Sequence, residues 1–297
     1  METKDRIRRC EEGDFNLPIG KRIYDLKDTT LIMGIVNVTP DSFSDGGKHY
    51  SVNDAVEGAL KMIDDGAHII DIGGESTRPG AESVTLKEEL DRVIPVIKGV
   101  GERSDIPISI DTYKSEVAKE AVDAGASMIN DISGMRFDEK MAPLAAELDI
   151  PVVLMHIKGT PKDMQKDPKY DDLIGEITDY LGGSIEIAVR AGVDFEKIIV
   201  DPGIGFGKTW DDNLTIIKRI TDFYVLGRPV MIGASQKAFI GGVTGRDAGD
   251  RLWGSLGAAA AAALYGAHMV RVHNVPETKD AVDVIDAIKR ESIERRA

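Results

Sequence analysis

Short apolar runs alternate with longer amphipathic segments from Leu31 to the end of the chain. The short runs are continuously apolar rather than alternating, which predicts strands buried on both faces. Eight runs have this character: Leu31–Asn37, His68–Gly73, Pro107–Asp111, Ser127–Asn130, Pro151–His156, Lys197–Asp201, Pro229–Ala234 and His268–His273. The segments between them predict helices, for example Asn53–Asp65, Leu86–Val100, Ser115–Asp123, Asp172–Arg190 and Pro276–Arg290.

Strands that alternate with helices form parallel βαβ units. One pattern recurs at Gly66–Asp71, Gly125–Asn130 and Gly266–Arg271: a glycine able to end a helix, a short apolar strand and a closing polar residue. An open doubly wound sheet uses the same unit, but a count of eight strands favours a closed (β/α)8 TIM barrel of the α/β class.

A single domain is expected, because 297 residues lie within the range of one barrel and no linker divides the chain. We assign residues 29–297 to the barrel. Residues 1–28 are an N-terminal extension that either forms a small hairpin at the barrel floor or frays.

The net charge of −14 argues against general affinity for nucleic acid or anionic membranes. Cys10 is the single cysteine, which fits a reducing compartment. The charged segment Met1–Arg9 lacks the apolar stretch of a secretory signal, and the most apolar window, Ala258–Leu264, is far shorter than the ~20 residues of a membrane span. We therefore expect a cytoplasmic protein.

The predicted strands end on polar residues, which buried strands do not need. These are Asn37, Asp71, Asp111, Asn130, His156, Asp201 and the pair Arg271 and His273. One such residue is explained equally well by a helix cap or a turn. A polar end on seven of eight strands instead predicts a pocket at the rim where barrel enzymes place their chemistry.

The loops after the first two strands carry further candidates. The segment Asn37–Gly47 is long, contains Phe43 and Asp45 and ends in two glycines. This composition predicts a mobile lid that closes on the bound substrate; the alternative is a surface loop without function. Gly73–Gly80 carries Arg78, which can pair with an anion.

The later loops indicate a flat polar ligand. The glycine-rich turn Asp201–Thr209 lacks the spacing of a nucleotide-binding loop, so we interpret its glycines as room for such a ligand. Ser235 lies where a helix is expected to begin, a natural anion site. Buried Asp111, Asn130 and Asp201 need partners, and a pterin or purine-like ring supplies them, with Lys237 donating to its carbonyl.

Seven motifs, in order, resemble those of the dihydropteroate synthase family: Asn37–Asp45, Gly73–Gly80, Ser109–Thr112, Ile129–Asp131, Leu154–His156, Asp201–Phe206 and Arg271–His273. The resemblance runs from about Leu31 to the C-terminus. It implies joining of 6-hydroxymethyl-7,8-dihydropterin diphosphate to 4-aminobenzoate with release of pyrophosphate, in folate synthesis. It also implies a homodimer that is a target of sulfonamides.

The resemblance further implies roles for single residues. Those implied to bind the pterin are Asp111, Asn130, Asp201 and Lys237. Asn37 is implied to bind Mg2+ that carries the diphosphate, with Arg271 and His273 beside it as an anion site. The 4-aminobenzoate site is implied to contain Phe43, Thr77, Arg78, Pro79 and Ser235, and Asp45 and Met155 are also expected to contact substrate. The expected catalytic residues are Asp111, Lys237, Arg271 and His273.

The chain departs from the family pattern at three positions. Where the family commonly has Ser-Arg-Lys-Ser, this chain has Ser-Gln-Lys-Ala, with Gln236 and Ala238 at the changed positions, and Asn274 replaces the usual aspartate. We expect Gln236 to offer a neutral donor to the second substrate. The departures leave the pterin residues unchanged.

Three other functions compete with this interpretation. A methyltetrahydrofolate-dependent methyltransferase shares the pterin site but needs no diphosphate clamp. A Schiff-base aldolase would use Lys237 as its nucleophile. A pterin-binding protein without catalysis would have no reason to keep the anion and metal positions.

Overall fold

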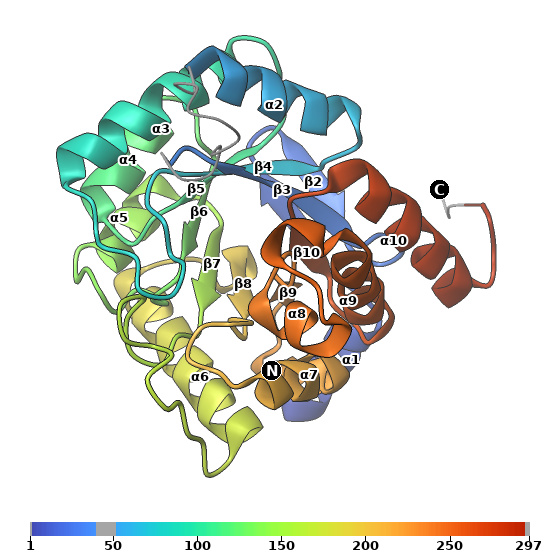
Figure 1. The fold of residues 1–297 in the computed structure, drawn as a ribbon. Coiled ribbons are helices and arrows are strands. Elements are labelled where there is room, and N and C mark those ends of the chain that lie inside the picture. The colour runs from blue at the N-terminus through green and yellow to red at the C-terminus, as the bar shows by residue number, and fades with distance from the viewer. Residues whose placement is uncertain (1, 40–51, 295–297) are drawn as a thin grey trace.

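A computed structural model of the chain describes residues 2–39 and 52–294, and its centre is a ring of parallel strands (Figure 1). The strands are β3 (Leu31–Asn37), β4 (Ile69–Gly73), β5 (Ile108–Asp111), β6 (Met128–Asp131), β7 (Val152–Met155), β8 (Ile198–Asp201), β9 (Met231–Ile232) and β10 (Met269–Val272). They pair in the order β8-β7-β6-β5-β4-β3-β10-β9, and a parallel bridge between Val200 and Val230 joins the two ends. The predicted (β/α)8 barrel is confirmed.

Helices surround this ring, as the amphipathic segments predict. They are α2 (Val52–Asp64), α3 (Leu86–Gly101), α4 (Ser115–Asp123), α5 (Met141–Leu148), α6 (Leu173–Ala191), α7 (Trp210–Lys218), α8 (Ala238–Thr244), α9 (Leu252–Leu264) and α10 (Val275–Arg290). Short 3-10 helices occupy Phe195–Lys197, Ile220–Leu226 and Ala248–Asp250. None of the helices in the described part of the chain is long and apolar enough to cross a membrane.

The recurring glycine pattern has the expected structural cause. Gly66, Gly125 and Gly266 have φ of 100°, 122° and 104°, a left-handed conformation that L side chains rarely adopt. Each ends a helix immediately before a buried strand. The strand β9 is shorter than predicted, because only Met231 and Ile232 pair with β10.

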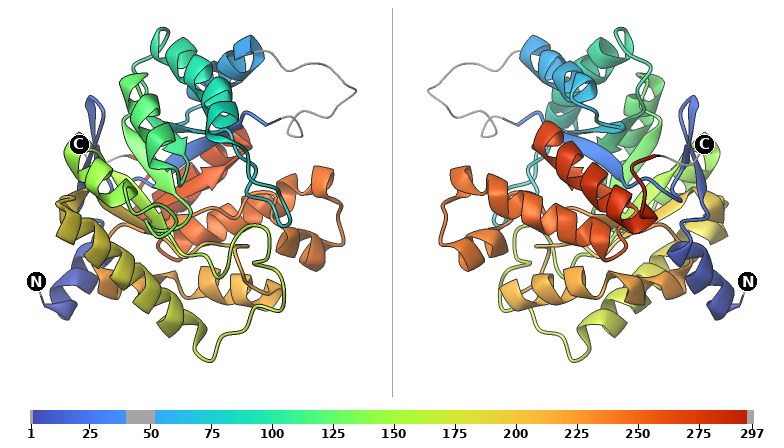
Figure 2. Two further views of the ribbon diagram at one scale, coloured as in Figure 1. Left: turned by 90° about the vertical axis from the view of Figure 1, so that its left-hand side faces the viewer. Right: turned by 90° about the vertical axis from the view of Figure 1, so that its right-hand side faces the viewer.

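The N-terminal residues pack against the end of the barrel where the strands begin. The helix α1 (Thr3–Glu11), which was not predicted, precedes an antiparallel hairpin of β1 (Asn16–Ile19) and β2 (Arg22–Asp25). Leu17 and Ile19 of the hairpin are buried, and the Tyr24 hydroxyl donates to the carbonyl of His68 at 2.7 Å. The helix α1, the hairpin and the C-terminal end of α10 lie at this end, opposite the loops that follow the strands (Figure 2).

Candidate active site

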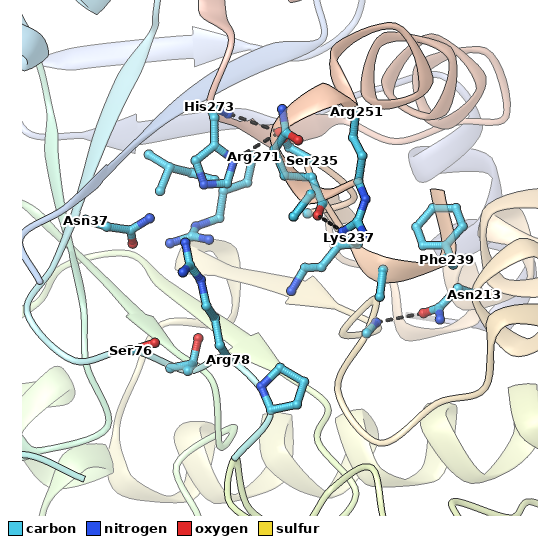
Figure 3. A pocket seen from close by; sticks show the side chains of 18 of the residues that line it. Asn37, Ser76, Arg78, Asn213, Ser235, Lys237, Phe239, Arg251, Arg271 and His273 are labelled. Atoms are coloured by element: carbon cyan, nitrogen blue, oxygen red, sulfur yellow. Dashed lines mark hydrogen bonds between the residues drawn. The ribbon is translucent and has the colours of Figure 1, made fainter. Parts of the chain in front are cut away.

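A cavity of about 710 Å3 opens at the carboxyl ends of the strands. Its walls come from strand ends and from the loops that follow β4, β8, β9 and β10, so residues distant in sequence converge on one space (Figure 3). Nine of the predicted site residues line it: Asn37, Thr77, Arg78, Pro79, Asp111, Ser235, Lys237, Arg271 and His273. Four of the polar strand-end residues, Asn37, Asp111, Arg271 and His273, therefore line a pocket, whereas Asp71, Asn130, His156 and Asp201 do not.

Five predicted residues are not part of the cavity lining described here. Asn130, Met155 and Asp201 are buried, with 3%, 4% and 3% of their surface exposed, and do not line the cavity. Phe43 and Asp45 lie outside the described residues.

Arg271 joins two carboxylates across the barrel. Its Nε donates to Asp71 Oδ2 and its Nη2 to Asp111 Oδ2, both at 2.6 Å. Asn130 Nδ2 also donates to Asp71 Oδ2, at 3.0 Å. The Asp71 side chain is wholly buried, so its charge needs this compensation. Two carboxylates thus already surround the guanidinium that the sequence analysis assigned to an anion site.

Burial changes the protonation of the cavity's charged groups. It raises the pKa of Asp111 to about 7, although Arg271 acts in the opposite direction. It lowers the pKa of Lys237 to about 8, and repulsion from Arg271 adds to this effect. It raises the pKa of Asp201 to about 6, against the stabilising hydrogen bond from Gly203. Both Asp111 and Lys237 therefore titrate near neutral pH.

The glycine-rich turn after β8 fixes Asp201 and supports Lys237. The Gly203 N–H donates to Asp201 Oδ1 at 2.7 Å. Gly205 has φ of +81°, and a Cβ there would lie 3.1 Å from Lys237 Cδ. The Lys237 ammonium lies 4.2 Å from the centre of the Phe206 ring. The absent Cβ of Gly205 thus leaves space that the Lys237 side chain occupies.

His156 supports the cavity from behind instead of facing it. Its side chain is buried, and its Nδ1 lies 2.8 Å from Lys208 Nζ. Lys208 lines the cavity and also donates to the carbonyl of Phe206 at 3.0 Å. Burial lowers the pKa of Lys208 to about 7 and that of His156 to about 2, so the histidine ring is neutral.

The loop after β9 differs from the sequence interpretation. The helix α8 begins at Ala238 with Lys237 as its N-cap, so Ser235 lies before the helix start rather than at it. Ser235 Oγ instead lies 3.0 Å from His273 Nδ1. Burial and the charge of Arg271 lower the pKa of His273 to about 4, which keeps that ring neutral.

The loop after β4 is anchored by its glutamate. Glu75 accepts from the Tyr113 hydroxyl at 2.8 Å and from Lys114 Nζ at 2.5 Å. Lys114 also binds Glu89 at 2.6 Å. This buried charge network holds the base of the loop, while Arg78 at its tip stays exposed beside the cavity.

Several residues at the cavity were not singled out from the sequence. They are Lys208, Trp210, Asn213 and Arg251, and the pairing of Asp71 with Arg271 was not foreseen either. Asp71 closes a predicted strand and was therefore detectable, whereas the others follow ordinary helical or loop patterns. In the described ranges, no cluster of three or more His, Cys, Asp or Glu side chains is arranged to hold a metal ion.

Comparison with known proteins gives the same assignment as the motifs. A family model described as pterin binding enzyme matches residues 33–273. The chain is 46% identical to a dihydropteroate synthase of Synechocystis over 92% of this chain and 95% of the relative, and 50% identical to that of Bacillus subtilis over 88% and 90%.

Solved structures agree with these relatives. A Xanthomonas albilineans dihydropteroate synthase with 4-aminobenzoic acid superposes with a TM-score of 0.86 at 45% identity, covering 92% of this chain and 97% of that one. The same enzyme with 7,8-dihydropteroate gives 0.83 at 42% identity, covering 92% and 98%. The family resemblance found in the motifs is confirmed: this chain belongs to the dihydropteroate synthases, transferases of the pterin binding enzyme family.

Proposed function

We propose that the cavity binds 6-hydroxymethyl-7,8-dihydropterin diphosphate at its base and 4-aminobenzoate nearer its mouth. The main support is the convergence of Asp111 and Lys237 on the cavity wall, with Asp201 buried at the start of the turn whose Gly205 lies against Lys237. A carboxylate can accept two N–H bonds from the amino-pyrimidinone edge of a pterin, and an ammonium can donate to its carbonyl. The buried Asn130 adds an amide at the position of the neighbouring strand that is in register with Asp111.

The reaction forms a bond between the amine nitrogen of 4-aminobenzoate and the methylene carbon of the pterin. The carbon–oxygen bond to diphosphate breaks, and its electron pair leaves with pyrophosphate. The amine loses one proton. A neutral aniline is already nucleophilic, so the protein's contribution is positioning and electrostatics. Asp111 balances the positive charge that develops on the pterin ring. Arg271 and His273 stabilise the negative charge that develops on the leaving diphosphate.

Mg2+ is the cofactor that the family implies. Mg2+ keeps several waters and commonly takes one or two protein oxygens together with phosphate oxygens. Asn37 fits this requirement, because its amide faces the cavity at the end of β3 (Figure 3). Bound there through Asn37, the ion would neutralise charge on the diphosphate.

The second-substrate assignment uses the other wall of the cavity. Thr77, Arg78 and Pro79 line this wall together with Ser235. The similar Xanthomonas structure carries 4-aminobenzoic acid, and a Yersinia pestis relative was solved with a sulfonamide drug complex. We infer that both compounds compete for this wall.

We also propose a cytoplasmic homodimer. The helices α9 and α10 expose large apolar side chains, with Trp253 exposed by 69% and Val284 and Ile288 by 59% and 58%. Apolar groups on adjacent helices favour a contact with a second copy. Sedimentation equilibrium at micromolar concentration tests this, and a monomer throughout would contradict it.

A pyrophosphate-release assay tests the proposed reaction. Release from the dihydropterin diphosphate should require 4-aminobenzoate, and 7,8-dihydropteroate should appear in equal amount. Turnover that depends on a corrinoid, or trapping of Lys237 by borohydride with a carbonyl substrate, would instead support the competing functions.

Replacing Asn37 by alanine should distinguish binding of the diphosphate group from binding of the pterin ring. We expect turnover and affinity for the pterin diphosphate to fall by about tenfold, because a ligand to the diphosphate-bound ion is lost. Affinity for a pterin without diphosphate should stay within about twofold. Isothermal titration with both ligands measures this, and an equal loss for both would assign Asn37 to the ring site.

The pH dependence of kcat/KM should be bell-shaped. Asp111 must be ionised to accept N–H groups, so activity should fall as the pH drops through about 7. Lys237 must be protonated to donate, so activity should fall as the pH rises through about 8. Because Asp111, Lys237 and Arg271 interact electrostatically, the two apparent pKa values of this profile describe the cluster as a whole rather than single residues. Lys237→Met should remove the alkaline limb from the residual activity, and an unchanged limb would show that another group produces it.

A further inference from the structure

Two of the positions at which this chain departs from its family contact each other. Gln236 Nε2 donates to Asn274 Oδ1 at 3.1 Å. Gln236 lies in the loop after β9 and Asn274 in the loop after β10, and both line the cavity. We call this hydrogen bond the loop clasp. The Gln236 amide nitrogen thus donates to Asn274, a contact that the sequence analysis did not anticipate, while the Gln236 amide oxygen is buried without a hydrogen-bond partner among the described residues.

A second contact lies directly beside the loop clasp. Ser235 Oγ is 3.0 Å from His273 Nδ1, and it also accepts from the His273 N–H at 3.3 Å. Adjacent residues of one loop are thus bonded to adjacent residues of the other. This pairing fixes the register between the two loops that carry Ser235, Lys237, Arg271 and His273.

The backbone of Gln236 is held in an uncommon conformation. Its φ is 61°, in the left-handed region that a residue with a side chain occupies only when its surroundings impose it. Its N–H donates to Ser255 Oγ at 3.0 Å, and its carbonyl accepts from Arg251 Nη1 at 3.1 Å. Both partners lie near the start of α9. Three contacts therefore hold this one residue.

The conformation of Gln236 determines where its neighbour points. Lys237 follows it directly, and the side chain of Lys237 extends over Phe206 toward Asp201 and Asp111. In Figure 3 the labelled Lys237 reaches into the cavity from the loop that also carries Ser235. A change of φ at Gln236 would rotate the peptide that precedes Lys237 and move its ammonium.

We propose that Gln236 and Asn274 are a matched pair of positioning residues that holds Lys237 and Ser235 at the substrates. The proposal rests on the proposed function of the cavity. The changes from the common arginine and aspartate are then one coupled change, from a charged pair to a neutral amide pair. The neutral pair avoids desolvating two charges at the cavity wall, and it adds no cation beside the second substrate.

A double-mutant cycle tests the pairing. Gln236→Ala and Asn274→Ala should each lower kcat/KM for the pterin diphosphate by about fivefold, the effect of one lost hydrogen bond. The double variant should be no worse than either single variant, because the same contact is removed. Losses that multiply to about 25-fold would overturn the proposal. Gln236→Arg combined with Asn274→Asp keeps the contact as an ion pair and should return kcat/KM to within about twofold of wild type; failure of this rescue would also count against the proposal.

Glycine variants separate positioning from stability. Gln236→Gly relieves the left-handed φ but removes the clasp, so thermal stability should stay equal or rise while kcat/KM falls about fivefold. Glu291→Gly is the matched control: Glu291 has φ of 53° at the end of α10 and does not line the cavity, so its activity should be unchanged. Unchanged activity of Gln236→Gly would contradict the positioning role. Absence of turnover in the wild-type protein would contradict the proposed function. The pairing of Gln236 and Asn274 is tested separately, because the cycle compares each variant with the wild-type protein.

Discussion

Replacing Arg271 by methionine should lower the free energy of unfolding by about 3–5 kcal/mol at pH 8, the usual cost of removing one member of a buried ion pair. The guanidinium contacts Asp71 and Asp111 at 2.6 Å each, and the side chain is only 18% exposed. Its loss leaves two carboxylates in the barrel without their counter-ion. Turnover should fall by at least about a hundredfold, because the variant loses the cation that we propose stabilises the leaving diphosphate and because Asp111 loses its counter-ion.

The loss of unfolding free energy in Arg271→Met should increase as the pH rises. Without Arg271 the pKa of Asp111 rises further above the value of an unfolded aspartate, so the folded state binds the proton more tightly. A group with a raised pKa contributes stability at low pH that is lost as the pH rises through the folded-state value. Urea unfolding should therefore show a small deficit near pH 5 and a large one near pH 8.

Arg219→Met is the matched control for this measurement. Arg219 pairs with Asp222 at 2.6 Å, but the two side chains are 51% and 37% exposed. Solvent screens such a pair, so its loss should cost less than about 1 kcal/mol at either pH. Equal deficits for the two variants would show that the Arg271 cluster is not a compensated buried network.

The fold could be predicted because burial on both faces leaves a direct signature in the sequence. The run Val152–Met155 is apolar at every position, and Ile198–Asp201 is apolar at all but its last position. Polar residues at the ends of several of these runs, such as Asp111, marked the cavity, whereas others, such as Asp201, hold the turn that follows the strand. Helix starts were less certain: Ser235 is a favoured N-cap residue, yet α8 begins at Ala238, after Lys237.

The contacts within the site could not be predicted, because they depend on side-chain direction across the barrel. Asp71 and Arg271 are separated by 200 positions, and nothing local indicates that they pair. His156 closes a strand as Asp111 does, yet it turns away from the cavity to meet Lys208. The neighbouring departures at Gln236 and Asn274 were visible separately, and only the fold brings them together.

Gly203→Ala should be the most disruptive of the small substitutions at the site. A Cβ at this position would lie 1.9 Å from the carbonyl oxygen of His156, and φ is +73°. Steric overlap with backbone and a left-handed conformation together should cost about 3–5 kcal/mol. Pterin affinity should fall as well, because the Gly203 N–H that holds Asp201 at 2.7 Å would move.

Gly249→Ala provides the comparison, since Gly249 also lines the cavity but has open space around its Cβ position and no positive φ. We expect its stability to change by less than about 0.5 kcal/mol, as for most substitutions away from strained or packed positions. Urea unfolding measures both variants, and titration with a pterin ligand reports the position of Asp201. If Gly203→Ala unfolded like wild type and bound pterin normally, the turn after β8 would have to be free to shift, and the close contact between its backbone and β7 would not be what orients Asp201.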